Sequence, residues 1–283
     1  MKTSNIAIVT DSTADIPDDL AEKSGISVIP NLVVIDGVAV EDGKGMTRQE
    51  FYSALPQMDN LPTTATASAG VYHLLYEKLF QQGISHIISI HPSLQLSGII
   101  NAASMAAESF GKRVSVIDSE SISLGQGFQA LAASEAAAAG ATVDAILSLI
   151  NEMKKRIRLV AMLDTLEYVR RSGRVNWARA RLGDFFRIKP FLEVKKGQVL
   201  SLGETRTYRK GFLRMLEMLK SLGPLERLAI LHTNAENAAQ QLLDEYCMKI
   251  LSEPIIVNVT TVIGSHVGPN GLGFVAVSKK PSP

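Results

Sequence analysis

Most of the signals that mark specialised classes of protein are missing from this chain of 283 residues. It has a single cysteine, Cys247, so no disulfide can form within the chain, and its helical surroundings favour a core thiol over a nucleophile. No apolar run approaches the roughly 20 residues of a membrane-spanning helix, and no signal-peptide pattern precedes the first apolar segment. These absences predict a cytoplasmic protein without stable membrane insertion.

The chain also lacks an excess of either positive or negative charge. Lysine and arginine number 29 against 28 aspartate and glutamate, the formal net charge is +1, and the basic stretches are short. Nucleic-acid binding needs clustered lysine and arginine to neutralise phosphates, so this balance argues against a nucleic-acid partner.

The familiar motifs of catalysis and cofactor binding are absent too. There is no GxxxxGK[ST] phosphate loop and no GxSxG nucleophile elbow. The histidines show no metal-ligand spacing with the cysteine; they are His73, His86, His91, His232 and His266. We therefore expect no metal, no cofactor and no catalytic residue.

In the first half of the chain, short and nearly continuous apolar runs alternate with helical periods. This pattern predicts a doubly wound, mostly parallel α/β sheet domain. The expected strands are Ile6–Thr10, His86–Ile90, Val114–Ile117 and Leu159–Leu163. The expected helices are Pro17–Ser24, Gly70–Gln82, Ser97–Phe110, Leu124–Ala139 and Val143–Ile157. Two extended runs around Asp36-Gly37, within residues 28–40, predict a small hairpin insertion.

The length exceeds the size at which a single core stops growing, so two lobes are expected. After about Leu163 the pattern becomes α+β. It comprises helices at 165–174, 209–222 and 235–250, a strand at 228–232, and a hairpin of 188–194 with 198–207 around Lys196-Gly197. We expect an N-terminal domain of residues 1–160 and a C-terminal domain of residues 161–283.

Three predicted strands end in an acid followed by a hydroxyl residue, at Asp11-Ser12, Asp118-Ser119 and Asp164-Thr165. Ligands of open α/β sheets bind beyond the carboxyl ends of strands, but the same residues also cap helices. Capping is favoured for Asp118 and Asp164, and the role of Asp11 stays open. An alternative hypothesis is therefore an α/β phosphohydrolase or phosphotransferase that uses Asp11 as its nucleophile.

Uncharged hydroxyls cluster before two predicted helices, at Thr63-Thr64 and between Ser93 and Ser97. Hydroxyls and free N–H groups at helix starts can hold an anion. His266 lies in the glycine-rich run 264–273 between two apolar strand-like stretches, Ile255–Ile263 and Phe274–Val277, so we expect it on a loop that a ligand can approach closely. A turn with a bystander histidine is the alternative. One histidine with uncharged donors suits a carboxylate or phosphate that is held and then released.

Taken in order over essentially the whole chain, these motifs resemble the DegV family. They are residues 9–15 (VTDSTAD), 62–64 (PTT), 96–98 (LSG), 116–119 (VIDS), 166–175 (LEYVRRSGRV), 189–190 (KP) and the His266 glycine run. The resemblance implies a two-lobed bacterial protein that binds a long-chain fatty acid, such as palmitate, stearate or oleate, in a tunnel between and within its lobes. It also implies a carrier subunit, not an enzyme, that presents the carboxylate to a separate ATP-binding fatty-acid kinase subunit, with the acyl phosphate passing to phospholipid synthesis.

The resemblance also implies which residues act. The expected head-group ligands are Thr63, Thr64, Ser93, Ser97 and His266, and the expected docking residues for the kinase are Arg170, Arg206 and Arg209. The chain departs from the family where Ala65-Thr66-Ala67-Ser68 replaces the frequent Ser-Gln-Pro-Ser and where Ile99 follows Leu-Ser-Gly. A solvated basic face is the alternative for the arginines, and a small-molecule sensor on the same scaffold is a further functional alternative.

Overall fold

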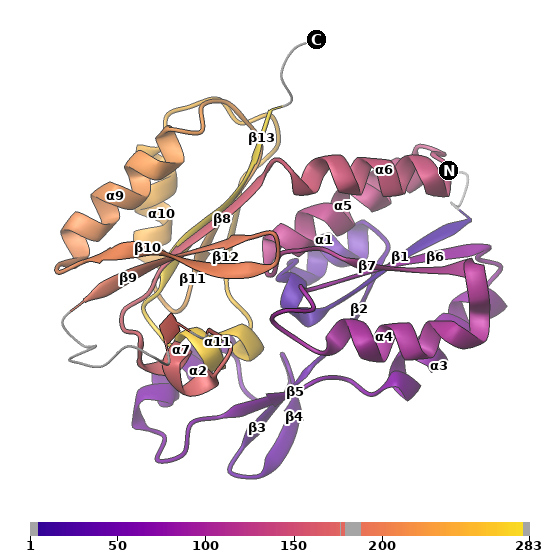
Figure 1. The fold of residues 1–283 in the computed structure, drawn as a ribbon, viewed down its shortest axis with the longest axis horizontal. Helices are drawn as coiled ribbons and strands as arrows, with labels where there is room; N and C mark the ends of the chain where they lie inside the picture. The colour runs from indigo at the N-terminus through magenta and orange to yellow at the C-terminus, as the bar shows by residue number, and fades with distance from the viewer. Residues whose placement is uncertain (1–4, 176, 179–187, 280–283) are drawn as a thin grey trace. The chain divides into compact units, whose positions relative to one another are not determined.

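The computed structural model describes residues 5–175, 177–178 and 188–279 of the chain (Figure 1). The chain divides into two compact units. Unit 1 is Met1–Leu32 with Ala65–Lys155, and unit 2 is Val33–Thr64 with Arg156–Pro283. Residues 33–64, which we expected within the N-terminal domain, thus belong to the same unit as the C-terminal part of the chain.

Unit 1 contains a parallel sheet with the strand order β2-β1-β6-β7. Its strands are β1 (Ile6–Asp11), β2 (Ile26–Ile29), β6 (His86–His91) and β7 (Val114–Asp118). Its helices are α1 (Asp18–Lys23), α3 (Ala69–Gln81), α4 (Ile99–Ala107), α5 (Leu124–Ala138) and α6 (Val143–Lys154), with short 3-10 turns η1 (Ser12–Ala14) and η3 (Glu108–Arg113).

Helices cover both faces of this sheet, with α3 and α4 on one side and α5 and α6 on the other (Figure 1). Tyr72 and Tyr76 of α3 and Ala103 of α4 pack against Ile87 of β6 in one core cluster. Strands covered on both faces must be apolar along their whole length, which is why they read as continuous apolar runs in the sequence. The predicted doubly wound architecture is confirmed.

Unit 2 contains a mixed sheet with the strand order β10-β9-β8-β13-β11-β12. Its strands are β8 (Ile157–Met162), β9 (Lys189–Lys195), β10 (Gln198–Thr205), β11 (Leu225–His232), β12 (Ile255–Asn258) and β13 (Leu272–Ser278). Strands β11 and β12 are parallel, and the other neighbours are antiparallel.

The position of β8 corrects the sequence analysis. The run Leu159–Leu163 was expected as a strand of the first half, but β8 pairs with β9 and β13 in unit 2. An apolar run shows that a strand is buried and does not show which strand pairs with it. The fourth strand of the parallel sheet is instead β2, at its edge.

The main core of unit 2 lies between this sheet and two helices, α9 (Tyr208–Lys220) and α10 (Glu236–Glu245). It includes Phe212 of α9, Leu242 of α10 and Phe274 of β13, all buried. Helix α10 ends at Glu245, earlier than the predicted Ile250. The remaining helices of unit 2 are α2 (Arg48–Ala54), η2 (Leu55–Gln57), α7 (Glu167–Ser172) and α11 (Thr261–Val267).

A small three-stranded sheet has the order β4-β3-β5 and consists of β3 (Leu32–Ile35), β4 (Val38–Glu41) and β5 (Thr63–Ala65). The turn between β3 and β4 places Asp36 at φ 48° and Gly37 at φ 82°, and the β9–β10 turn places Lys196 at φ 50° and Gly197 at φ 79°. Two successive left-handed residues are what a tight hairpin requires. Both predicted hairpins are confirmed.

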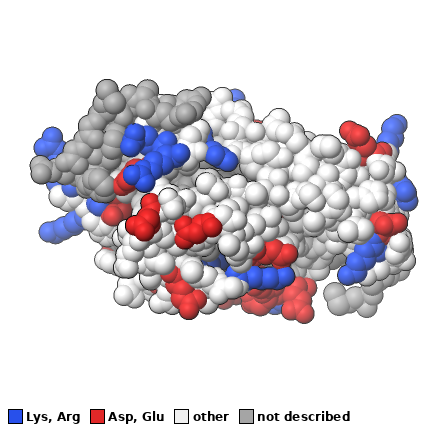
Figure 2. Space-filling view, turned by 90° about the horizontal axis from the view of Figure 1, so that it is seen from below, with Lys and Arg blue, Asp and Glu red and all other residues white. Residues whose placement is uncertain are grey.

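None of the described helices is long and apolar enough to cross a membrane. On the face seen in Figure 2, basic and acidic side chains form separate small groups beside a large uncharged area. No continuous basic band crosses the described part of this face, in keeping with the balanced composition.

Candidate ligand head-group site

A pocket of about 310 Å³ in unit 2 brings together three of the predicted head-group residues, Thr63, Thr64 and His266. This volume lies at the lower end of the range of small-molecule sites. Its lining also includes Leu61, Pro62, Tyr168, Arg171, Ser172, Arg174 and Ser265. The walls therefore come from β5 and the segment before it, from α7 and the residues after it, and from α11.

His266 and Thr64 form a hydrogen-bonded pair at the pocket, with 3.0 Å between Nε2 of the imidazole and Oγ1 of the threonine. Burial, with a smaller contribution from the charge of Arg174, lowers the pKa of His266 from 6.5 to about 4. The imidazole is therefore neutral near pH 7. If its Nε2–H donates to Thr64, the hydroxyl hydrogen of Thr64 is free to donate to an oxygen of a ligand.

The backbone that carries His266 differs from our expectation. The residue lies in the last turn of α11 and not on a loop. The helix begins at Thr261 because Thr260 caps it, its side chain accepting a hydrogen bond from the N–H of Ile263. The glycine-rich composition of this run, which we interpreted as a loop open to a ligand, has another physical cause.

Gly264 of α11 and Gly268, directly after the helix, make room for protein side chains. A Cβ on Gly264 would lie 2.4 Å from Oη of Tyr52, and a Cβ on Gly268 would lie 2.2 Å from a ring carbon of Tyr168. Gly268 also has φ 78°, which other residues rarely adopt. The hydroxyl of Tyr52 donates to the carbonyl of Val259 at 2.8 Å, so α2 and α7 hold α11 from two sides. This close packing fixes the position of His266.

Two arginines that we did not assign to the head group also line the pocket. Arg171 lies on α7, which ends at Ser172, and Arg174 follows Gly173, whose φ of 70° ends the helix. Both arginines line the pocket. Arg171 pairs with Glu167 at 3.0 Å, and a guanidinium nitrogen of Arg174 donates to the carbonyl of Ser172 at 2.9 Å. The uncharged donor set expected from the sequence is thus accompanied by two positive charges, which favour an anionic ligand. The basic run 170–174 was the signal for them, although we assigned only its Arg170, and that to partner docking.

Ser93 and Ser97 belong to unit 1. They lie in the segment between β6 and α4, where Ser93 is buried and Ser97 is half-buried. The Ser93 hydroxyl accepts a hydrogen bond from the N–H of Gln95 at 3.2 Å, and that of Ser97 accepts one from the N–H of Ile99 at 3.3 Å. Because the Ser97 oxygen accepts there, its O–H remains available to donate to a ligand.

Comparison with known proteins gives the family of this chain. The family model described as DegV matches residues 5–279. This chain belongs to the DegV family. Protein DegV of Bacillus subtilis is 34% identical over 277 residues, which cover 95% of this chain and 98% of that protein. A DegV domain-containing protein of Streptomyces coelicolor is 33% identical over 279 residues, covering 97% and 99%.

Solved structures of DegV proteins share the fold. A DegV family protein of Thermus thermophilus, described as binding fatty acid, superposes with a TM-score of 0.88 at 30% identity and covers 97% of this chain and 99% of its own. Bacillus subtilis DegV, described as a fatty acid binding protein, gives a TM-score of 0.84 at 31% identity and covers 98% and 100%. The predicted family and fold class are confirmed.

In this DegV protein, both oxygens of Asp11 are occupied by hydrogen bonds within unit 1, and the residue is fully buried. The five donors are the N–H and hydroxyl of Thr13, Nδ2 of Asn31, Nδ1 of His91 and Nε2 of Gln126, at 2.5 to 3.0 Å. The described residues also contain no cluster of histidine, cysteine, aspartate and glutamate that could hold a metal. A carboxylate that accepts this many hydrogen bonds within the protein has a structural role. The observation therefore does not favour Asp11 as a nucleophile.

The other strand-end acids of this DegV protein also make local contacts. Asp118 accepts hydrogen bonds from the N–H groups of Leu94 and Glu120, and Asp164 pairs with Lys189. The predicted docking residues Arg206 and Arg209 are exposed on either side of the start of α9, and Arg170 is exposed on α7.

Proposed function

We propose that this DegV protein binds one long-chain fatty acid and holds its carboxylate at the pocket of Thr64 and His266. The observation that carries the proposal is the hydrogen-bonded Thr64–His266 pair, with Arg171 and Arg174 on the same pocket. Support comes from DegV proteins at 30% and 31% identity that are described as fatty acid binding. Palmitate, stearate and oleate are the ligands to test first, with the acyl chain enclosed in an internal tunnel.

The energetics suit a carrier that gains most of its affinity from the buried acyl chain and uses hydrogen bonds to orient the head group. Each buried methylene contributes roughly 0.8 kcal/mol, so a sixteen-carbon chain gains on the order of 12 kcal/mol before ordering costs. A hydrogen bond to a charged group adds about 1.5 to 3 kcal/mol. The pocket residues therefore need only fix the carboxylate in place, and most of the affinity comes from the acyl chain.

We further propose that the protein presents this carboxylate to a separate ATP-binding kinase subunit in the cytoplasm and supplies no catalysis of its own. In the transfer, a carboxylate oxygen attacks the γ-phosphorus of ATP and ADP leaves, giving an acyl phosphate for phospholipid synthesis. A neutral His266 donates its one N–H to Thr64, whose hydroxyl then donates to the ligand, and no proton passes to the carboxylate, so the carboxylate stays ionised and nucleophilic.

Lipid analysis of the purified protein tests the binding proposal. Protein expressed in bacteria, extracted with organic solvent and examined by mass spectrometry should yield about one long-chain fatty acid per chain. Thr64→Ala and His266→Ala in delipidated protein should weaken fatty-acid binding, whereas Thr66→Ala, an exposed threonine nearby, should not. Repeated extraction of intact, folded protein without any lipid would contradict the proposal.

We also propose that Thr63, Ser93 and Ser97 bind the carboxylate head group, with Ser97 as the most important of the three. Ser97→Ala should weaken acyl binding or slow acyl-phosphate formation while the fold stays intact. If Ser97 and His266 bind the same carboxylate, the double variant should lose less than the sum of the two single losses, with a coupling of at least about 0.5 kcal/mol. Strict additivity in titration calorimetry would remove Ser97 from the head-group site.

A further inference from the structure

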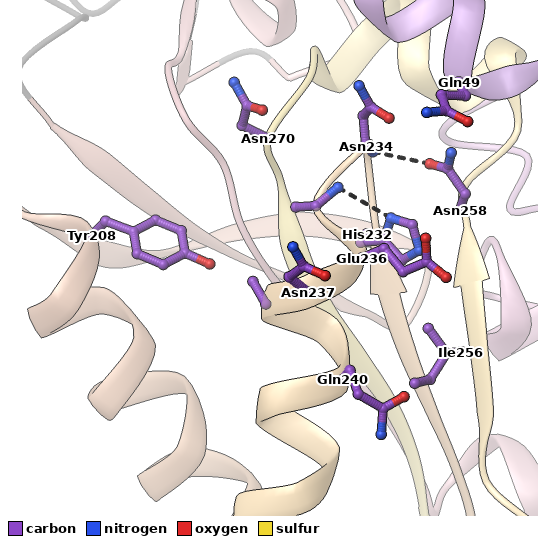
Figure 3. A pocket seen from close by; sticks show the side chains of 12 residues that line it. Gln49, Tyr208, His232, Asn234, Glu236, Asn237, Gln240, Ile256, Asn258 and Asn270 are labelled. Carbon is purple, nitrogen blue, oxygen red and sulfur yellow. Dashed lines mark hydrogen bonds between the residues drawn. The ribbon is translucent and has the colours of Figure 1, made fainter.

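A second pocket in unit 2 is larger than the head-group pocket and shares no lining residue with it. It has a volume of about 750 Å³ and lies beyond the carboxyl ends of β11 and β12, at the start of α10 (Figure 3). The crevice beyond the carboxyl ends of parallel strands is where open α/β sheets commonly bind ligands. Its volume falls within the range of small-molecule sites.

The chemical character of this second pocket comes from side-chain amides. Six carboxamides line it, contributed by separate segments of unit 2: Gln49, Asn234, Asn237, Gln240, Asn258 and Asn270. No lysine or arginine is among the lining residues, and Glu236 is the single charged one. A carboxamide both donates and accepts hydrogen bonds, and no cation is among the lining residues to bind an anion. The lining therefore suits a neutral ligand that carries donors and acceptors together.

Some of these side-chain amides make hydrogen bonds within the protein and others do not. Oδ1 of Asn258 accepts a hydrogen bond from the N–H of Asn234 at 3.0 Å (Figure 3), and Gln240 donates to Asp244 at 2.8 Å. Within the described part of the chain, the side chains of Gln49, Asn237 and Asn270 make no hydrogen bond and are exposed at the pocket. Three complete amide groups are thus available to a ligand.

His232 adds a buried donor to the pocket. The residue is only 6% exposed, and its Nδ1 accepts a hydrogen bond from the N–H of Ala235 at 3.2 Å (Figure 3). Because Nδ1 accepts this hydrogen bond it carries no proton, so the ring is neutral and its proton lies on Nε2. Burial also lowers the pKa of the ring. No described residue accepts a hydrogen bond from that Nε2–H. That N–H is therefore available to donate to a ligand oxygen in the pocket that His232 lines.

Tyr208 supplies an aromatic ring at the edge of the pocket, where it is 37% exposed. An aromatic ring packs against the C–H faces of a sugar ring while amides bind its hydroxyls. From the amides, the free N–H of His232 and the absence of a lining cation, we propose that this pocket binds a neutral polyhydroxylated ligand, a sugar or a polyol. The inference does not depend on fatty-acid binding, because the two pockets have no residue in common.

Ligand-observed NMR with the full chain tests the proposal. The probes are glucose, galactose, myo-inositol and glycerol, with adenosine as a neutral nucleoside and glucose 6-phosphate as the anionic counterpart. At least one neutral polyol should show saturation transfer and should shift the backbone amide resonances of residues 234–237 and 270. Glucose 6-phosphate should bind more weakly than glucose, because Glu236 is near and no cation lines the pocket.

Variants locate the binding. Asn237→Ala should weaken binding of the neutral ligand at least about fivefold, whereas Asn101→Ala, an exposed asparagine on α4 of unit 1, should leave it unchanged. His232→Asn keeps an acceptor near the position of Nδ1 for Ala235 and loses the Nε2–H, so it should weaken binding while the spectrum stays that of the folded protein. His266→Ala should have no effect, which separates this test from that of the proposed function.

Three results would overturn the proposal. One is that none of the four polyols binds. Another is that adenosine or glucose 6-phosphate binds in place of the polyols. The third is that polyol binding is equal in Asn237→Ala, His232→Asn and the Asn101→Ala control.

Discussion

At the scale of single residues, the glycines near His266 do mark a close contact, as the sequence analysis predicted. The group that lies close to them is a protein side chain and not a ligand. Gly264 and Gly268 face Tyr52 and Tyr168, two aromatic side chains of the protein itself. The histidine is presented by a short helix that these contacts hold in place. The site thus depends on Gly264, Gly268 and Tyr52, none of which lines the pocket.

Gly268→Ala should destabilise the protein by about 2 to 4 kcal/mol. The added Cβ would lie 2.2 Å from the Tyr168 ring, and the residue would have to keep a left-handed φ of 78°. Urea unfolding followed by circular dichroism measures the change. Gly70→Ala is the control, because a Cβ there meets only Ser68 Oγ at 3.6 Å within α3 and should be neutral or slightly stabilising. Equal stability of the two variants would contradict the packing argument.

The pKa of His266 predicts a dependence of stability on pH. The folded pKa of about 4 lies below the ordinary value of 6.5, so between these values the unfolded chain binds more protons at this residue. The contribution of His266 to the free energy of unfolding is fully present above about pH 6.5. It decreases by roughly 3 kcal/mol in all as the pH falls to about 4.

The measurement compares urea unfolding of the protein and of His266→Gln at pH 7.5, 5.5 and 4.5. The stability difference between the two should shrink as the pH falls, and NMR titration of the imidazole should give a midpoint near 4. Using the difference removes the effect of His86 and His232, whose pKa values burial also lowers. A His266 midpoint near 6.5 would show that the imidazole is solvated.

At the scale of secondary-structure elements, Asp11 joins parts of unit 1 that are far apart in the chain. Its carboxylate at the end of β1 binds His91 of β6, Gln126 of α5 and Asn31 after β2. The network continues from His91 to Ser89 at 2.7 Å and from Ser89 to the Tyr76 hydroxyl of α3 at 2.8 Å. In a buried network of this kind, the loss of one member leaves its partners unpaired at low dielectric, which is costly.

Asp11→Asn should therefore cost about 3 kcal/mol or more, since an amide cannot accept from all five donors and leaves buried N–H and O–H groups unpaired. Asp118→Asn is the matched control at the end of β7. That residue is only half-buried and accepts two backbone N–H groups, so the expected cost is about 1 kcal/mol. Urea unfolding measures both, and the two variants should be equal in any residual hydrolysis of p-nitrophenyl phosphate. An intrinsic phosphatase activity lost only in Asp11→Asn would restore the enzyme hypothesis.

At the scale of the whole molecule, the proposed carrier role requires a surface for a kinase. Arg206 and Arg209 are exposed beside the start of α9, and charges at the edge of an interface act mainly on the association rate and its salt dependence. Arg206→Glu with Arg209→Glu should leave fatty-acid binding unchanged and raise the carrier concentration needed for half-maximal kinase activity at least about tenfold at low salt.

The control for this experiment is Lys23→Glu with Lys78→Glu, which makes the same change of charge on exposed lysines of α1 and α3 in unit 1. It should leave the carrier concentration unchanged. Normal phosphorylation by the Arg206/Arg209 double variant at low carrier concentration and low salt would move the docking surface elsewhere.

The sequence by itself determined the features whose signals lie in a few neighbouring residues. The hairpins at Asp36-Gly37 and Lys196-Gly197 follow from residues that accept left-handed backbone, and the parallel sheet follows from strands that are apolar on both faces. The order of short motifs along the chain was enough to indicate the DegV family. Thr64 and His266 were both predicted, and the structure brings them together.

Only the tertiary structure decided what depends on residues distant in sequence. It placed β8 in the sheet of unit 2, where Val160 pairs with Phe274. It also placed His266 in the helix α11, with Tyr52 against Gly264 and Tyr168 against Gly268. It also brought Arg171 and Arg174 to the pocket and fixed Asp11 among five donors. Periodicity records how each segment is buried, whereas strand partners, pocket walls and the pKa of a buried histidine are set by side chains that the fold brings in from elsewhere.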